Sequence, residues 1–279
     1  MMNVTPQTVF ITGCSSGIGY TTAVSLKERG HRVICSARKI EDVTTLIEKG
    51  FECLQLDLAD SASIQTAVQA LIEMTDGKID ALFNNGAFGQ PGAVEDLSRE
   101  VLRNQFETNF FGPHELTNLL IPLMRKQGHG RIIYNSSVLG FVAMKFRGAY
   151  NSSKFALEGL ADTLRLELRG TGIHIVLIEP GPIESRFRAN AFAMYQKYID
   201  PTRSPHKQTY HAMEARLQKP GPAAPFTLPA TAVAEKVIHA LESKRPKLRY
   251  AVTVPTHLFA WLKRLLPADW LDKILVSVE

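Results

Sequence analysis

The chain of 279 residues has the composition of an ordinary globular protein, with 45% hydrophobic and 21% charged residues. Its formal net charge of +5 is not gathered into one basic run, which argues against a nucleic-acid partner. The three cysteines are too few for a disulfide framework, and their spacing matches no zinc site. We therefore expect reduced thiols, no metal ion, no nucleic acid and a cytoplasmic location.

The opening residues carry neither a basic segment nor a long apolar stretch, so we expect no secretory signal. The sequence has no run of about 18 uninterrupted apolar residues, so we expect no stable membrane insertion. The length suits one large domain, and we predict a single domain over residues 1–279.

Short apolar runs alternate with longer amphipathic segments over most of the chain. The runs predict strands at residues 8–12, 32–36, 52–56, 80–83, 131–135 and 173–178. The longer segments predict helices at 17–29, 41–49, 61–75, 98–126 and 149–169. Ser61 is the expected N-cap of the third helix, and the fourth helix is expected to be interrupted near Gly112-Pro113. This alternation predicts an α/β fold, a Rossmann-type doubly wound parallel sheet of about seven strands in three α/β/α layers.

The pattern divides the chain into three parts. Residues 8–184 are regular and predict the cofactor-binding and catalytic core. Residues 185–230 show no clean period and predict a segment that covers the substrate. Residues 231–279 predict a helix at 231–242, a last strand at 249–254 and terminal helices at 257–266 and 270–276. These terminal helices suit a membrane surface or packing on the protein, and their shortness and Pro267 favour packing.

A glycine-rich loop follows the first predicted strand and precedes the first predicted helix. Gly13, Gly17 and Gly19 have the spacing Gly-x3-Gly-x-Gly, which differs from the usual dinucleotide fingerprint. Glycines let backbone N–H groups approach a pyrophosphate, and the helix N-terminus adds partial positive charge. The strand-before, helix-after context favours nucleotide binding over a plain turn.

The end of the second predicted strand distinguishes NAD from NADP. NAD sites place a carboxylate there to hold the ribose 2′-hydroxyl. This chain has Arg38 and Lys39 instead, and its first carboxylate comes at Glu41. Arg38 can bind a 2′-phosphate through its planar fork of donors, whereas the alternative is two solvated surface cations. We predict NADP(H) as the cofactor.

Tyr150 and Lys154 lie four residues apart near the start of a predicted long helix. Residues at this spacing share one helix face, and an ammonium near a phenol lowers the phenol pKa. Tyr150 could then act as an acid or base on a substrate oxygen. Ser136-Ser137 follows the fifth predicted strand on the same side of the sheet, where a hydroxyl could hold that oxygen or merely satisfy a turn.

Together these motifs resemble the short-chain dehydrogenase/reductase family over nearly the whole chain. Thr12-Gly13-x3-Gly17-x-Gly19 matches the family's glycine motif, and Tyr150-x3-Lys154 matches its active-site pair. The resemblance implies that Ser137, Tyr150, Lys154 and Asn109 are catalytic, with Asn109 anchoring a water near Lys154. Hydride would pass between NADP(H) and a carbonyl or alcohol carbon.

The resemblance also implies the cofactor-binding residues. These are Gly13, Ser15, Ser16, Gly17, Ile18, Gly19, Arg38, Asp57, Leu58, Asn85, Gly86, Tyr150, Lys154, Pro180, Gly181, Ile183 and Ser185. The chain departs from the family at two positions. It has Asn85-Gly86-Ala87 where the family has Asn-Ala-Gly, and Ser185 where the family often has threonine. We expect altered torsions at the first and a retained hydroxyl at the second.

Residues 150–160 and 179–183 are similar to the branch that contains 17β-hydroxysteroid dehydrogenases, retinol dehydrogenases and bacterial NADP-dependent aldehyde reductases. This likeness implies an apolar carbonyl or alcohol substrate and leaves a homodimer open. Candidate pocket walls, each of which could equally be core, are Phe88, Phe141, Met144, Phe187, Phe192, Met194 and Tyr195. The alternative functions are an NADPH-binding regulatory protein without turnover and a structural or nucleic-acid-binding module.

Overall fold

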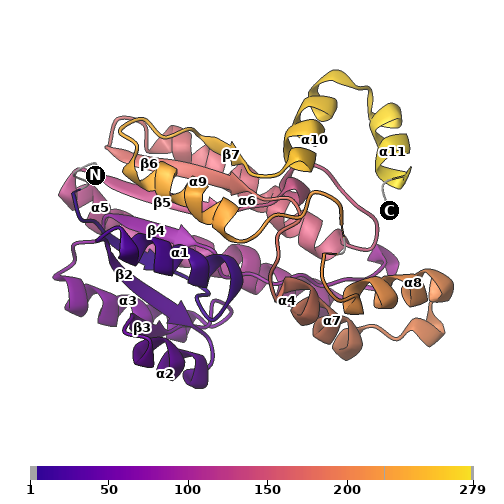
Figure 1. Ribbon diagram of the computed structural model, residues 1–279, viewed down its shortest axis with the longest axis horizontal. Helices are drawn as coiled ribbons and strands as arrows, with labels where there is room; N and C mark the ends of the chain where they lie inside the picture. The colour runs from indigo at the N-terminus through magenta and orange to yellow at the C-terminus, as the bar shows by residue number, and fades with distance from the viewer. Residues whose placement is uncertain (1–4, 223, 278–279) are drawn as a thin grey trace.

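The computed structural model describes residues 5–222 and 224–277. Residues 1–4, on which part of the signal-peptide expectation rests, 223 and 278–279 lie outside the described part. The centre of the structure is a seven-stranded sheet in the order β3-β2-β1-β4-β5-β6-β7. Each neighbouring pair is parallel (Figure 1). The strands are β1 Thr8–Ile11, β2 Arg32–Ala37, β3 Glu52–Gln55, β4 Ala81–Asn84, β5 Gly130–Asn135, β6 Ile173–Glu179 and β7 Arg249–Ala251.

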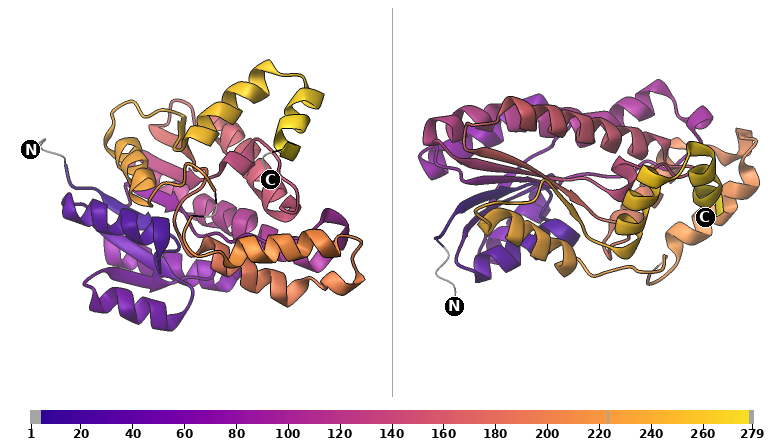
Figure 2. Two further views of the ribbon diagram at one scale, coloured as in Figure 1. Left: turned by 45° about the vertical axis from the view of Figure 1, so that its right-hand side comes forward. Right: turned by 90° about the horizontal axis from the view of Figure 1, so that it is seen from above.

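Helices cover both faces of the sheet, as the view along it shows (Figure 2). One layer contains α1 (Gly17–Glu28), α2 (Ile40–Glu48) and α9 (Thr231–Glu242), whose apolar residues share a core cluster with the sheet. The opposite layer contains α3 (Ser61–Thr75), α5 (Gly112–Gln127) and α6 (Gly148–Glu167) around a second cluster. The doubly wound, three-layer fold predicted from the sequence is confirmed.

The strand order reverses at β1, which lies between β2 and β4. Ile11 of β1 is in register with Cys35 of β2 and with Phe83 of β4. The connections that leave the carboxyl ends of β1 and β4 turn to opposite faces, which opens a crevice between them. Such a switch point is where open parallel sheets bind ligands, and the glycine loop begins there.

One local prediction was wrong. Asp60, not Ser61, is the N-cap of α3, and its carboxylate accepts a hydrogen bond from the Ala62 N–H at 3.0 Å. The interruption predicted near Gly112-Pro113 in the helix at 98–126 is present as a change of helix type directly before Gly112. The segment runs as α4 (Arg99–Phe106), a π-helical turn η2 (Glu107–Phe111) and α5, and Pro113 is accommodated in the first turn of α5, where no N–H donor is needed.

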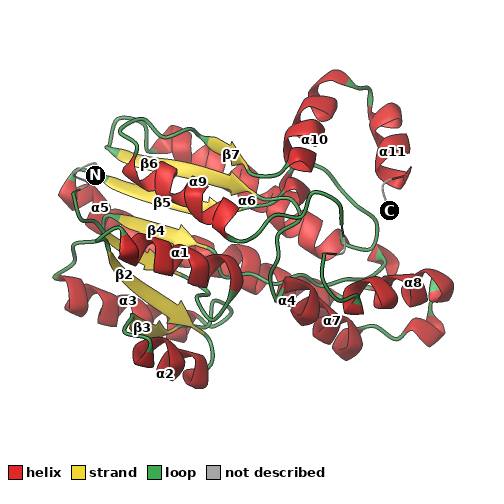
Figure 3. Ribbon diagram, in the orientation of Figure 1, coloured by secondary structure: helices red, strands yellow, loops and turns green. Residues whose placement is uncertain are grey.

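Residues beyond β6 contain more helix than their pattern indicated (Figure 3). The segment predicted as irregular contains α7 (Phe187–Tyr198), a short 3-10 turn η4 (Pro201–Arg203) and α8 (Lys207–Gln218). Tyr195 and Tyr210 are buried between α7 and α8 in a small separate cluster. The Tyr210 hydroxyl donates to the Asp96 carboxylate at 2.5 Å, which ties this lobe to the turn after β4.

The terminal helices α10 (Val254–Leu265) and α11 (Ala268–Ser277) pack against the turn after β5, the 3-10 helix η3 (Val138–Gly140). Phe259 and Leu275 are the buried contacts. This is the packing that the sequence favoured, although Trp261 and Trp270 remain exposed. In the described part of the chain, no helix combines the length and apolarity needed to cross a membrane.

Candidate active site

The glycine loop between β1 and α1 leaves the N-terminus of α1 open to an anion. Gly13 and Gly17 adopt positive φ angles of 72° and 58°, which only glycine takes up at little cost. Ser16 occupies the N-cap position, but its side chain caps none of the described N–H groups, and the first turn carries no acidic residue. The same position is capped by side chains in α3 and α4. The loop therefore fits a dinucleotide pyrophosphate.

Four hydrogen bonds hold this loop against the residues that follow β4. The Asn85 side-chain amide donates to the carbonyl oxygens of Thr12 at 2.9 Å and Gly13 at 3.1 Å. The Thr12 hydroxyl accepts from the N–H groups of Asn85 and Gly86. The sequence analysis used Thr12 only as part of the glycine motif. Its position directly after the first strand, next to the end of the fourth, was the available signal that it holds the two loops together.

Gly86 makes room for the Leu58 side chain and does not adopt an unusual torsion. Neither Gly86 nor Ala87 has a positive φ, so the altered torsions expected from their swapped order are not left-handed ones. A Cβ at Gly86 would lie 2.9 Å from a methyl carbon of Leu58. Leu58 is buried there, which brings the loop after β3 next to the loop after β4.

The predicted adenosine end lies at the carboxyl ends of β2 and β3. Arg38 is exposed immediately after β2, and its carbonyl oxygen accepts from the Gln55 side chain at 3.2 Å. Asp57 is half-buried, and its carboxylate accepts from the Ala59 N–H at 2.9 Å, which orders the turn. The structure thus brings an exposed guanidinium and an ordered carboxylate to one edge of the crevice, and Lys39 begins α2 as its N-cap.

Tyr150 and Lys154 lie on the first turns of α6, with Lys154 Nζ 5.7 Å from the centre of the Tyr150 ring. The ammonium donates to the Asn135 carbonyl oxygen at 2.7 Å. Burial lowers the pKa of Lys154 to about 8, and the charge of Glu158 opposes that shift. Asn135 was not predicted as a site residue; its position at the last residue of β5 was the available signal.

The prediction that the pKa of Tyr150 is lowered was wrong. Burial raises the pKa of Tyr150 to about 12, and it outweighs the hydrogen bond from Ser137 and the charge of Arg147, which act in the lowering direction. The desolvation of the phenolate is the larger effect because the ring is packed under the covering segment. Tyr150 therefore holds its proton at neutral pH.

Ser137 and Ser136 differ in what their hydroxyls contact. Ser137 caps η3, its oxygen accepts from the Leu139 N–H at 3.1 Å, and its hydroxyl also hydrogen-bonds with Tyr150. Ser136 lies beside Glu158 instead. Of the two serines left open by the strand pattern, the structure thus places Ser137 beside the phenol.

Asn109 lies in the π-helical turn η2 and is almost fully buried. Its side chain exchanges two hydrogen bonds with the backbone of Phe88, at 3.1 Å and 2.9 Å, and donates to the Ser153 hydroxyl at 3.3 Å. The π turn adds a residue to the helix and directs Asn109 toward the loop after β4 and toward α6. The structure thus places Asn109 beside Ser153, the residue that precedes Lys154.

The segment after β6 lies over the crevice. The Pro180 carbonyl oxygen accepts from the Val138 N–H at 2.8 Å, which joins it to the Ser137 turn. A Cβ at Gly181 would lie 2.1 Å from the Thr253 hydroxyl, so only glycine fits there. Ile183 forms a bridge with Leu228, and Ser185 lies close to Gly17 of the glycine loop.

Phe187 is the candidate pocket wall that the structure places directly on the phenol. Its ring contacts the Tyr150 ring edge-on, with centroids 5.3 Å apart. Phe141 and Met144 join the cluster of η3, α10 and α11 that also contacts Tyr150. Phe192 and Tyr195 belong to the separate cluster of the α7–α8 lobe, where they are core.

Comparison with known proteins identifies the family. The model of the family described as short chain dehydrogenase matches residues 7–196. This chain belongs to that family of oxidoreductases. The match covers the glycine loop, Ser137, Tyr150 and Lys154 and ends within α7.

Three curated relatives cover most of the chain. The uncharacterized oxidoreductase YbbO of Escherichia coli strain K12 is 43% identical over 272 residues, which is 98% of this chain and 95% of that protein. Human retinol dehydrogenase 8 is 34% identical over 219 residues, 75% of this chain and 69% of that protein. The NADPH-dependent 3-dehydrocapnine reductase of Ornithobacterium rhinotracheale is 34% identical over 273 residues, 95% of this chain and 94% of that protein.

Solved structures share the fold. A variant of actinorhodin polyketide ketoreductase with NADPH superposes with a TM-score of 0.73 at 26% identity, over 88% of this chain and 95% of that one. A Burkholderia phymatum short-chain dehydrogenase/reductase in complex with NAD has a TM-score of 0.77 at 23% identity, over 95% and 94%. Proteins of this fold thus hold either nicotinamide cofactor.

Proposed function

We propose that this protein is an NADP(H)-dependent oxidoreductase that interconverts an apolar aldehyde or ketone and the matching alcohol. The proposal rests mainly on one observation: Ser137, Tyr150 and Lys154 lie together in a site that also contains the glycine loop, where no side chain caps the N-terminus of α1. The crevice fits a dinucleotide because the α1 N-terminus is open at one end and the Lys154 ammonium lies at the other. When bound there, NADPH would supply hydride for the carbonyl carbon.

The chain's own residues would manage the proton and the developing charge. Tyr150, a neutral phenol at neutral pH, would donate its proton to the carbonyl oxygen. Ser137 would donate a hydrogen bond to the same oxygen and fix its position. Lys154 would hold the ribose hydroxyls and stabilise the phenolate that remains. Asn109 would order the loop after β4 and a water leading from Lys154 to solvent.

The remaining predicted contacts follow the crevice from one end to the other. Gly13, Ser15, Ser16, Gly17, Ile18 and Gly19 would hold the pyrophosphate, Asp57 and Leu58 the adenine, and Asn85 and Gly86 the central ribose region. Pro180, Gly181, Ile183 and Ser185 would face the nicotinamide. Residues 185–230 would close over the substrate, while residues 8–184 form the core and residues 231–279 complete the sheet and its edge.

The preference for NADP(H) rests on Arg38. It is exposed at the end of β2, where a 2′-phosphate would lie, and no shielding carboxylate follows it until Glu41. The NADPH named for the 3-dehydrocapnine reductase and for the ketoreductase structure supports the same preference. Arg38→Asp is expected to weaken NADPH binding by at least about tenfold, because a charge-assisted bidentate contact is replaced by repulsion. Equal losses of NADPH and NADH affinity in fluorescence titrations would contradict this role.

An apolar substrate is proposed because the wall of the site is aromatic. Phe187 covers the Tyr150 ring, and Phe141 and Met144 lie in the cluster beside it. The similarity to retinol dehydrogenase 8 supports a large apolar carbonyl or alcohol. We further propose that the protein acts on a small molecule in the cytoplasm, as its reduced thiols would allow.

The decisive experiment is the oxidation of NADPH with a panel of medium-chain and aromatic aldehydes and retinal. Tyr150→Phe is expected to lower kcat by at least about 100-fold while NADPH affinity is kept, since only the proton donor is removed. Tyr198→Phe is the matched control, because its hydroxyl accepts a hydrogen bond from Asn104 in α4 and, among the described residues, bonds to none of the proposed catalytic groups. Undiminished turnover in Tyr150→Phe would refute the catalytic assignment, and NADPH binding without turnover in the wild type would favour a regulatory protein.

A further inference from the structure

Glu158 is a buried carboxylate that the proposed mechanism does not use. It lies one helical turn after Lys154 on α6, so the two side chains share a helix face. Lys154 is 3% exposed and Glu158 is 7% exposed. Carboxylates are rarely buried to this degree without a partner, and Glu158 is the charged group that raises the pKa of Lys154 against the effect of burial.

Glu158 is held by a guanidinium from the last strand. Its Oε2 accepts from Arg249 Nη2 at 2.7 Å, and the same guanidinium contacts Asp162 Oδ2 at 2.9 Å and Glu179 Oε1 at 3.0 Å. Arg249 thus faces three carboxylates, and a second cation, Arg165, also pairs with Asp162 at 3.2 Å.

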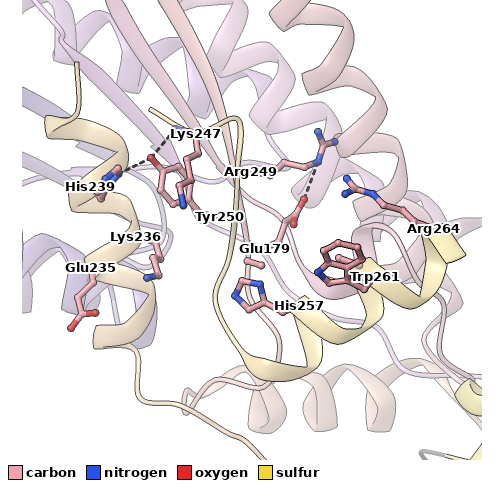
Figure 4. Close-up of a pocket in the computed structure, with 12 residues that line it drawn as sticks. Glu179, Glu235, Lys236, His239, Lys247, Arg249, Tyr250, His257, Trp261 and Arg264 are labelled. Atoms are coloured by element: carbon pink, nitrogen blue, oxygen red, sulfur yellow. Dashed lines mark hydrogen bonds and ion pairs between the residues drawn. The ribbon is translucent and has the colours of Figure 1, made fainter. Parts of the chain in front are cut away.

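The outer end of the cluster is visible where Arg249 contacts Glu179 (Figure 4). These two residues form part of the wall of a cavity of about 500 Å³ between α9 and α10, which Trp261 and Arg264 also line. Burial raises the pKa of Glu179 to about 7, and the neighbouring charge of Glu158 adds to that rise. The cluster therefore connects the catalytic helix with the solvent-facing side of β7.

We propose that Glu158 is a positioning residue that keeps the ammonium of Lys154 charged above neutral pH, with Arg249 holding its carboxylate in place. The inference rests on the proposed function, because it concerns the same lysine. Without a fixed negative charge nearby, a buried ammonium loses its proton readily. A neutral Lys154 would neither hold the ribose hydroxyls as a cation nor stabilise the phenolate of Tyr150.

The other groups packed around Lys154 cannot supply that charge. On α6 itself, Tyr150 is neutral at neutral pH and Asp162 lies two turns away. β5 and the turn after it contribute the neutral Asn135, Ser136 and Ser137, and η2 contributes the neutral Asn109. From β6, β7 and α10 come Glu179, Arg249 and Arg264. The two arginines are cations, and Glu179 contacts Arg249 and has a pKa that burial raises to about 7, so it is only partly charged at neutral pH.

The sign of the effect separates this role from simple structural support. Below neutrality Lys154 is charged with or without Glu158, so neutralising Glu158 costs nothing there. Near pH 8 the ammonium is half deprotonated, and the loss of Glu158 would lower its pKa by about one unit or more. The expected loss of activity is therefore about fivefold at pH 8 and negligible at pH 6. A purely structural role would reduce activity by the same factor at both pH values.

The experiment compares Glu158→Gln with Glu158→Asp and Asp162→Asn in the full chain. The alkaline limb of the kcat/KM profile for NADPH and an accepted aldehyde should move to lower pH in Glu158→Gln alone, while Glu158→Asp restores it. Asp162→Asn is the matched control because it removes another partner of Arg249 farther along α6. Since Arg249 keeps two carboxylates, Glu158→Gln should fold, and Glu158→Met is a second neutral variant of similar size.

A direct titration makes the result independent of turnover. In protein carrying ¹³Cε-labelled lysine, the Lys154 signal is assigned by its loss in Lys154→Met. Its titration midpoint should fall by about one unit in Glu158→Gln and stay in place in Asp162→Asn. An unmoved midpoint in both neutral variants would overturn the inference. A wild type without turnover but with the shifted midpoint would instead overturn the proposed function and leave Glu158's effect on Lys154 intact.

Discussion

Replacement of Gly19 by alanine tests whether the glycine loop is built as the structure indicates. A Cβ at this position would lie 2.3 Å from the Gly13 carbonyl oxygen and 2.6 Å from the Asn85 side-chain nitrogen. The loop can relieve these overlaps only by moving away from Asn85, which would break the two hydrogen bonds that hold Thr12 and Gly13. Lost hydrogen bonds and overpacking together cost about 3–5 kcal/mol, and the gain in helix propensity returns about 1 kcal/mol.

The assay is urea unfolding of the free protein together with fluorescence titration of NADPH. Gly19→Ala should lower the free energy of unfolding by about 2–4 kcal/mol and weaken NADPH binding by at least about tenfold. Gly159→Ala is the control, because an added Cβ there would meet no heavy atom of the described residues within 4 Å. It should raise stability by about 0.5–1 kcal/mol and leave NADPH binding unchanged. If Gly19→Ala were as stable as Gly159→Ala, the close packing inferred for this loop would be wrong.

Three further predictions concern the N-cap of α3, the packing of α9 and the cover of the site. Asp60→Ala should cost about 1 kcal/mol in urea unfolding and Ser61→Ala clearly less, because only Asp60 caps α3; the reverse order would restore Ser61 as the cap. Arg29 lowers the pKa of Glu242 through a hydrogen bond, so the stability that separates wild type from Glu242→Gln at pH 7 should shrink as pH falls below about 4; a constant difference down to pH 3 would disprove this linkage. Phe187→Ala should raise KM for apolar aldehydes by about tenfold with a smaller effect on kcat, whereas an unchanged KM would remove Phe187 from the substrate wall.

The sheet and its helices were predictable because parallel strands are buried on both faces. Their apolar runs are nearly continuous, and the amphipathic crossovers between them are distinct. The helices Ser61–Thr75 and Thr231–Glu242 begin and end where the sequence placed them. The α7–α8 lobe was missed for the opposite reason. Its buried Tyr195 and Tyr210 pack in a small separate cluster with Phe146 and Phe192, so neither helix presents a long apolar stripe to the main core.

The positions of the candidate site residues followed from strand ends, but their electrostatics did not. The spacing of Tyr150 and Lys154 predicts a shared helix face, and the end of the fifth strand puts Ser136-Ser137 on the same side of the sheet. The choice of Ser137 came from the family resemblance. The charge of Arg249 reaches the same helix from a strand that follows it by many residues, and no local pattern reports such a contact. The π-helical turn that holds Asn109 could not be predicted either, because no residue type in this stretch distinguishes a π turn from an α-helix.

The two perturbed groups of the site lead to a consistent expectation for its pH dependence. Burial raises the pKa of Tyr150 and lowers that of Lys154, so at neutral pH the pair consists of a neutral phenol and a charged ammonium. This is the form that donates a proton to a carbonyl oxygen while keeping a cation beside the phenolate left behind. Because Lys154 loses its proton first as pH rises, the reduction of a carbonyl should weaken from about pH 8 upward, before the phenol itself titrates.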